Sequence, residues 1–529
     1  MNKFDFLYEK DQLTKLIILD ILITKSKIAP TGQITMPIHD LQCNLKISFG
    51  IILTLTTLKK RILALADDVT TLHYDNWIVV DGDGEWIKLN VKMADHYICL
   101  KQFYLKTSTK FRLLDRIIQH EDDHLIDFCE ALHLSRTKIN DMKSHLNQGI
   151  TQLNQGIRIK NYKLVGEEKA IRDFLFALYF LCFNGAYVPV SERVINQANQ
   201  NVVRINSTLQ EPLSQVHVVA FRCYYAVSVL RLNLHHVIKD DLQLFVPQVY
   251  KCSQWIGPSI NSLFTQDPFI PRLTGADLVN EIEWYMLFIM ACDNNTKKIG
   301  KTVFLSSYYC ELFQAISATI NRQFVLTFGN NYTKQQDVTT KLSDKFFTIV
   351  LRYVVRHSIG STNVSDHSFD HINKSIDRHP ICAIFLLNCL ADLAQTIYPA
   401  HLHERENFLK ATFSQLLYKT LTIIPISQFI QPINVYIDFS QGFMDNTHAA
   451  RLLEEMGEYL NIYFVKDWQN EPIDVYISDM PDSDCFSSKN GVSVTVNQYF
   501  SDVDLTRIRQ LLITVLGNKF WQQKVGLPQ

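Results

Sequence analysis

Helical periodicity of apolar residues runs almost unbroken through the middle of the chain, from about residue 184 to residue 424. Apolar side chains recur there every three to four positions, and no alternating β-branched run competes with that pattern. Helices are therefore predicted at residues 218–232, 276–291, 304–324, 343–357, 382–398 and 404–420. Two helical bundles of roughly 110 to 120 residues each fit this length. They are expected to separate near the polar cluster 294–301.

Residues 1–100 predict a winged helix-turn-helix, a unit of three helices followed by a hairpin. Apolar spacing from residue 11 onward favours the first helix, which Pro and Gly residues interrupt. A second helix is expected at about 37–45, and a third after residue 48, through Ile52 and onward to Ile62. Residues 77–87 contain two short strand-like runs around a Gly-bearing turn.

The same order of elements returns in residues 103–184 with stronger periodicity. Helices are predicted at 111–118 and 125–132, and Ser135 is expected to cap a third helix. The inner face of that third helix is expected to carry Ile139, Met142, Leu146, Ile150 and Leu153. Residues 156–166 alternate like a small hairpin, and an apolar helix follows at 167–183.

From residue 430 to residue 522 the pattern changes to alternating strands and helices. Strands are predicted at 433–437, 462–465, 473–477 and 492–496, and helices at 447–460 and 504–515. This order indicates a small sheet with crossover helices. Since 529 residues exceed what one hydrophobic core supports, the chain is predicted to be multidomain and mainly α, with an α/β domain at its C-terminal end.

The overall charge excludes a generally polyanion-binding protein. Lys and Arg number 52 against 53 Asp and Glu, so the net charge is −1 and any nucleic-acid affinity must come from a local cluster. Between Leu134 and Lys163 six basic residues occur with one acid, Asp141. This surplus coincides with the third helix and hairpin of the second winged unit. Double-stranded DNA is therefore the expected partner.

Two groups of side chains are expected to divide the DNA contacts of this second unit. The first turns of its third helix need short polar or basic groups to reach base edges, whereas wing cations neutralise phosphates. The predicted DNA-binding residues are Ser135, Arg136, Thr137, Lys138, Asn140, Lys143, Arg158, Lys160 and Lys163. A solvated helix face is the alternative interpretation of such charges. The coincidence of cap, polar face and hairpin favours DNA.

The first winged unit carries a weaker DNA-binding signal. Its predicted contacts are Lys46, Thr56, Lys59, Lys60 and Arg61, and no acid occurs between residues 43 and 62. Its third helix is more apolar than a typical reading helix. A helper domain that contacts only the DNA backbone is therefore the alternative to base readout.

The segment LVGEEKAIRDFLFALYF, residues 164–180, follows the Ser-led helix and small hairpin. In this order it resembles the Mga/RofA-like transcriptional regulators of Gram-positive bacteria, most specifically over about residues 107–185. The resemblance implies an activator of virulence or surface-protein genes, with two DNA-binding domains, two helical phosphotransferase-regulation domains and a C-terminal domain similar to enzyme IIB of sugar phosphotransferase systems. The corresponding ranges are 1–100, 103–184, 185–297, 298–425 and 430–522.

The resemblance also implies that histidines of the helical domains accept phosphate from phosphocarrier proteins of the phosphotransferase system. The candidates are His235, His236, His357 and His379. The family's acid-His pattern is absent at residues 234–237, where no carboxylate precedes the two histidines. A neutral, hydrogen-bonded histidine is the alternative interpretation of each position.

No metal or cofactor is predicted. His367 and His371 have the i, i+4 spacing of a zinc site but no evident third ligand, and His401 with His403 has the same defect. Enzyme IIB would carry a phosphorylatable cysteine after its first strand, where this chain has Ser440. The C-terminal domain is therefore expected to be a sensor or assembly module, and the chain a homodimer or higher homo-oligomer.

The sequence favours a cytoplasmic protein that is not an enzyme. It has no nucleophile elbow or phosphate loop. Its longest clean apolar run, residues 174–183, is far shorter than the roughly 20 residues that span a bilayer. The 11 cysteines include no Cys-x-x-Cys pair, which is typical of reduced thiols. An RNA-binding antiterminator and a non-catalytic interaction scaffold remain the alternative functions.

Overall fold

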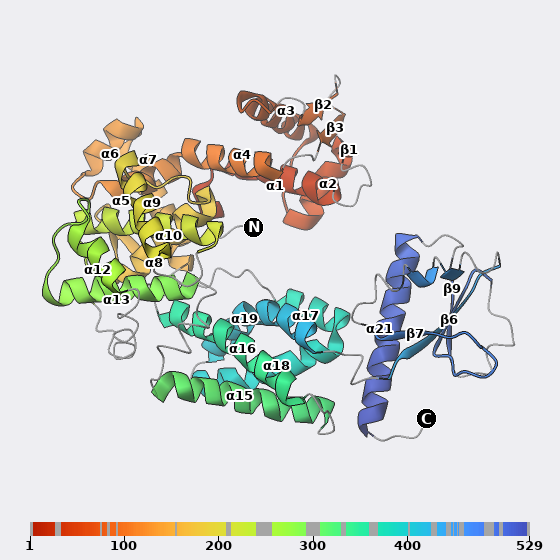
Figure 1. The fold of residues 1–529 in the computed structure, drawn as a ribbon. Helices are drawn as coiled ribbons and strands as arrows, with labels where there is room; N and C mark the ends of the chain where they lie inside the picture. The colour runs from red at the N-terminus through yellow and green to blue at the C-terminus, as the bar shows by residue number, and fades with distance from the viewer. Residues whose placement is uncertain are drawn as a thin grey trace. The chain divides into compact units, whose positions relative to one another are not determined.

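Helices form most of the described chain, with small sheets beside them (Figure 1). The computed structural model describes residues 4–26, 33–74, 77–81, 85–90, 94–153, 156–207, 213–239, 257–292, 307–329, 335–358, 369–399, 402–424, 431–440, 446–447, 449–451, 453, 460–480, 491–496 and 501–525. Contacts divide the chain into two compact units, residues 1–293 with 358–362 and residues 294–357 with 363–529. The prediction of a mainly α protein is confirmed. The predicted polar separator 294–301 lies outside the described residues.

The first unit begins with three helices and a three-stranded antiparallel sheet. These elements are α1 (Lys10–Ser26), β1 (Gln33–Pro37), α2 (Ile38–Phe49), α3 (Leu55–Thr71), β2 (Ile78–Val80) and β3 (Trp86–Asn90). The strand order is β1-β3-β2, so β1, which the sequence did not predict, extends the expected two-stranded hairpin. Leu41, Leu58 and Ile62 are buried between the helices.

The third helix of this element begins later than predicted. Gly50 ends α2 with a φ of 65°, a left-handed conformation that suits glycine. Thr54 then caps α3, its hydroxyl accepting a hydrogen bond from the backbone N–H of Thr57 (3.2 Å). Residues 50–54 are therefore the turn between the helices. Ile52, expected within the helix, lies exposed in that turn.

A second winged element follows in the predicted order, after the unpredicted α4 (Ala94–Thr107). It consists of α5 (Thr109–Gln119), α6 (Leu125–Leu132), α7 (Arg136–Leu153), β4 (Arg158–Lys160), β5 (Lys163–Val165) and α8 (Glu168–Phe183). The buried Ser108 caps α5, and its hydroxyl donates to the carbonyl of Leu7 (2.5 Å) in the short η1 (Asp5–Leu7). One continuous hydrophobic core joins both winged elements to α8.

A helical bundle completes the first unit. It contains α9 (Glu192–Asn206), α10 (Gln215–Asn233), α12 (Gly257–Gln266) and α13 (Gly275–Cys292). α10 packs against both α8 and α9. The buried Asp267 accepts hydrogen bonds from Asn201 (2.9 Å) and from the hydroxyl of Tyr225 (2.7 Å), which connects α9, α10 and the end of α12.

The helices of the second unit surround one apolar helix. They are α15 (Ser307–Phe328), α16 (Gln335–Ser358), α17 (Phe369–Arg378), α18 (Pro380–Ile397) and α19 (Leu402–Ile423). Among the described helices, α18 alone has the length and hydropathy that could cross a membrane. It packs against α15, α17 and α19, with Phe385, Leu386 and Leu390 fully buried. A core position therefore explains its composition.

The C-terminal sheet has four parallel strands in the order β7-β6-β8-β9. They are β6 (Ile433–Asp438), β7 (Ile462–Phe464), β8 (Val475–Ser478) and β9 (Val492–Thr495). α21 (Asp502–Val525) contacts β6 and continues beyond its predicted end at residue 515. The predicted helix 447–460 lies largely outside the described residues.

Candidate nucleic-acid interface

α7 presents polar residues to solvent because its apolar residues are buried on the other side. As predicted, Ser135 caps it, with the Ser135 hydroxyl accepting a hydrogen bond from the N–H of Lys138 (3.3 Å). The buried residues are Ile139, Met142, Leu146 and Ile150, whereas Leu153 is only half-buried. The exposed residues of the first turns are Arg136, Thr137, Lys138 and Asn140. This is the helix end that can enter a major groove.

One side chain attaches the following hairpin to α7. Asn147 donates through Nδ2 to the carbonyl oxygen of Ile159 (3.0 Å), and its Oδ1 accepts the N–H of the same residue (2.5 Å). β4 and β5 are joined by Asn161 and Tyr162, whose φ angles of 51° and 59° suit a type I′ turn. The hairpin is thereby held as a wing in a defined position beside α7.

Tyr162 in the wing turn orients two of the predicted DNA contacts. Its hydroxyl donates to Oδ1 of Asn140 (2.8 Å), and the ammonium of Lys143 lies 4.7 Å from its ring centroid. The ring itself stacks on Phe128 of α6, with centroids 4.9 Å apart. Asn140 and Lys143 are thus positioned by the wing before any ligand binds.

Four exposed cations lie on α7 and the wing, Arg136 and Lys138 on α7 and Arg158 and Lys160 on β4, and α7 also exposes one acid, Asp141. Within the described ranges, none of the four forms an ion pair with a carboxylate. Lys163 differs, since it is half-buried and its ammonium lies 3.8 Å from the exposed carboxylate of Asp122. We infer that the four exposed cations have charge available for phosphates.

Lys110 on α5 is a further cation of this region that the sequence did not single out. Burial and the nearby charge of Lys138 lower the pKa of Lys110. Burial and Lys110 in turn lower the pKa of His145 on α7. Lys110 lies 28 positions before Lys138 in the chain, so only the packing of α5 against α7 reveals this concentration of charge.

Some of the predicted DNA-binding residues of the first winged element are exposed to solvent, and others contact the rest of the protein. Lys46, Thr56 and Lys60 are exposed, whereas Lys59 is half-buried. Arg61 turns toward α1 and pairs with Asp11, its Nε lying 3.0 Å from a carboxylate oxygen. The structure therefore leaves fewer cations free to face a ligand here than on α7 and its wing.

The candidate phosphorylation residues lie in different environments. His235 is exposed and has a φ of 62°, whereas His236 is half-buried. The side chain of His357 lies outside the described residues. His379 is the N-terminal cap residue of α18. Burial and the charges of Arg509 and Arg378 lower its pKa, so its neutral form is favoured.

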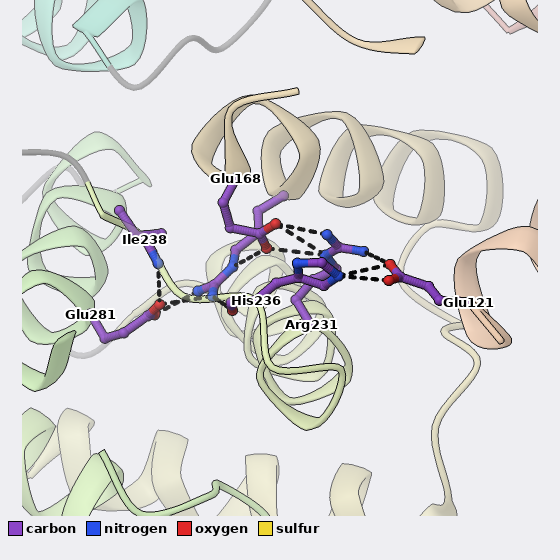
Figure 2. Close-up of polar contacts among 7 residues, drawn as sticks. Glu121, Glu168, Arg231, His236, Ile238 and Glu281 are labelled. Atoms are coloured by element: carbon purple, nitrogen blue, oxygen red, sulfur yellow. Dashed lines mark hydrogen bonds and ion pairs between the residues drawn. The ribbon is translucent and has the colours of Figure 1, made fainter. Parts of the chain in front are cut away.

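An ion network that connects the second winged element with the bundle contains His236 (Figure 2). Glu121, between α5 and α6, accepts hydrogen bonds from Arg231 of α10 (2.9 Å) and from Nε2 of His236 (2.8 Å). Arg231 also donates to both carboxylate oxygens of Glu168 at the start of α8. No carboxylate directly precedes His236 in the sequence, but the carboxylate of Glu121, 115 positions earlier, contacts its ring.

Arg172 of α8 extends the network into the bundle. Its guanidinium donates two hydrogen bonds to Glu281 of α13, at 2.6 and 2.8 Å, and one to Glu168 at 3.0 Å. Burial alone would raise the pKa of Glu168, but Arg231 and Arg172 outweigh it and the pKa lies below its ordinary value. Glu168 is therefore held as a carboxylate. The sequence did not reveal this network because its members are far apart in the chain.

The remaining predicted positions show no catalytic or metal-binding arrangement among the described residues. No group of three or more His, Cys, Asp or Glu there could hold a metal ion. His367 and His401, and the side chains of His371 and His403, lie outside the described residues. Ser440, after β6, donates from its hydroxyl to the carboxylate of Asp479 (2.5 Å).

Comparison with known proteins agrees with the position of this surface. Residues 99–180 match the family model described as the Mga helix-turn-helix domain, a span that includes α5 to α7, the wing and most of α8. No curated protein matches the chain. The resemblance to Mga-like regulators is therefore confirmed by this domain, and its helix-turn-helix indicates DNA binding.

Proposed function

We propose that this protein is a transcriptional regulator that binds duplex DNA through α7 and the β4–β5 wing. The observation that supports it most is the set of four exposed cations on a Mga helix-turn-helix domain: Arg136, Lys138, Arg158 and Lys160. Arg136, Thr137 and Lys138 would reach base edges from the first turns of α7. Arg158 and Lys160 would neutralise phosphates, which gives affinity that decreases with salt.

The test is binding of the full chain to duplex DNA after Arg136 and Lys138 are both replaced by Ala. Affinity should fall by about 1 to 3 kcal/mol for each residue that reads a base. A matched control replaces two exposed cations elsewhere, Arg193 on α9 and Lys341 on α16, and should bind as the wild type does. Equal affinity of all three proteins at moderate salt would refute the assignment. RNA hairpins as competitors test the antiterminator alternative.

For regulation, we propose that the helical segments 185–297 and 298–425 are phosphotransferase-regulation domains and that one histidine among His235, His236, His357 and His379 accepts phosphate. His236 is the most informative candidate because its Nε2 contacts Glu121. A phosphate there would add up to about two negative charges beside that carboxylate and repel it from the bundle. Mass spectrometry after incubation with the phosphocarrier proteins would locate the modification. With an active carrier, absence of label on these histidines would contradict the proposal.

The C-terminal α/β domain, proposed to be similar to enzyme IIB, would serve self-association in a cytoplasmic homo-oligomeric activator. The residue chosen to test this is Val503, an apolar side chain at the start of α21 that is 75% exposed. Replacing Val503 by Asp should reduce the oligomer size measured by light scattering. An unchanged oligomer would place self-association elsewhere.

A further inference from the structure

The first winged element exposes apolar side chains at the position where a helix-turn-helix meets its ligand. Ile47 at the end of α2 is 83% exposed, Ile52 in the turn is 79% exposed and Leu63 on α3 is 51% exposed. Phe49 and Leu55 beside the turn are exposed as well. We call these five residues the α2–α3 corner. None of the five residues belongs to the hydrophobic core of this element, so the core does not account for them. Several exposed apolar side chains on one small element can mark a binding site.

The charges around the α2–α3 corner indicate a polyanion as its occupant. No Asp or Glu occurs between residues 41 and 66. Lys46, one residue before Ile47, and Lys60 on α3 are exposed, and the next exposed acid on α3 is Asp67, one turn beyond Leu63. Apolar side chains together with these cations complement a ligand that carries phosphates around an apolar group.

The outer face of α3 is suited to contact with the major groove of DNA. Thr56, Lys60 and Leu63 are spaced four and three positions apart, so they lie on one side of the helix, and all three are exposed. The second helix of a helix-turn-helix enters the major groove with its first turns. The apolar group that base edges present in that groove is the C5 methyl of thymine.

We propose that the α2–α3 corner reads thymine methyl groups through Ile52, Leu55 and Leu63, while Lys46 and Lys60 contact the adjacent phosphates. The inference rests on the proposed function, since it assumes that the chain binds duplex DNA. It also explains why α3 is apolar where α7 is polar. The two winged elements would recognise different features of one site, methyl groups by the first and hydrogen-bonding edges by the second.

The test compares two duplexes of equal length, alternating d(AT) and alternating d(AU), which differ only in the thymine methyl. The full-length wild type should bind d(AT) more tightly, by about fourfold for each methyl group that it buries. Replacing Ile52 and Leu63 by Ala removes two of the three proposed methyl contacts and should lower the ratio of the two affinities several-fold toward one. Replacing the exposed Val203 and Val216, on α9 and α10, by Ala is the matched control and should preserve the ratio. Thermal unfolding confirms that each variant is folded.

The outcomes separate this inference from the proposed function. Substitution of Arg136 and Lys138 should weaken binding to both duplexes and leave the ratio unchanged. Binding of the wild type with a ratio of one, or a ratio that persists in the Ile52 and Leu63 variant, overturns the thymine contact alone. Absence of wild-type binding to either duplex at low salt overturns both. A corner variant that alters oligomer size but not the ratio would identify a protein-binding surface instead and refute the inference.

Discussion

Replacing Glu281 by Gln should destabilise the first unit by about 3 to 5 kcal/mol, because it leaves the charge of Arg172 without its main partner. Both side chains are fully buried, and the guanidinium makes two short hydrogen bonds to the carboxylate. Glu281 also accepts the backbone N–H of Ile238 (3.0 Å). Glutamine retains one acceptor oxygen but no charge. Glu168 still contacts Arg172, so we expect the lower end of the range.

A double variant distinguishes the loss of a buried charge partner from a loss of packing. Replacing both partners, with Met for Arg172 and Leu for Glu281, removes the buried charges together. Such a double variant should be far less destabilised than the single one, since the desolvation cost disappears with the attraction. Arg231 would still neutralise Glu168 in the double variant.

Hydrogen exchange of the full chain is the suitable assay, because a protein of several domains need not unfold in one transition. Amides of α8 and α13 should exchange between about a hundredfold and a few thousandfold faster in the single variant, as 3 to 5 kcal/mol implies. Glu192→Gln, at the exposed start of α9, is the matched control. A single variant that costs less than about 1 kcal/mol, or a double variant as unstable as the single, would refute the argument.

Three further predictions concern the winged element and its connection to the bundle. Asn147→Ala removes both hydrogen bonds that hold the wing and should weaken DNA binding by about 1 to 2 kcal/mol in a gel shift, and an unchanged affinity would show that the wing is held otherwise. The lowered pKa of Glu168 contributes stability that is present above its ordinary value of 4.5 and is lost as the pH falls below it. Hydrogen-exchange protection of the α8 amides should therefore fall more steeply below about pH 4.5 in the wild type than in Glu168→Gln, and parallel curves would contradict this. Gly149→Ala should destabilise α7 despite the better helix propensity of Ala, because the added Cβ would overlap the ring of Phe6, and a higher melting temperature would show that the ring moves aside easily.

Local signals in the sequence were enough to predict most of the helices and the hairpin of the second winged element. Ser135 before an apolar period of helical spacing predicts both the start of α7 and its buried face. The same signals were weaker in the first element. Ile52 continues the apolar pattern of α3, yet the cap at Thr54 and the left-handed Gly50 make residues 50–54 a turn. Periodicity alone could not locate that turn, because the turn residues are themselves apolar.

The sequence alone determined the mainly helical architecture, the local surplus of cations and the identity of the helix that carries them, because each depends on neighbours within a few turns. Only the tertiary structure decided which charges remain available. It pairs Arg61 with Asp11, brings Lys110 toward Lys138 and places Glu121 beside His236, over separations of 28 to 115 positions. Such pairings depend on how helices pack, which no local pattern records. A buried charge also requires a partner at hydrogen-bond distance, so packing selects these partners from among many acids and bases of the chain.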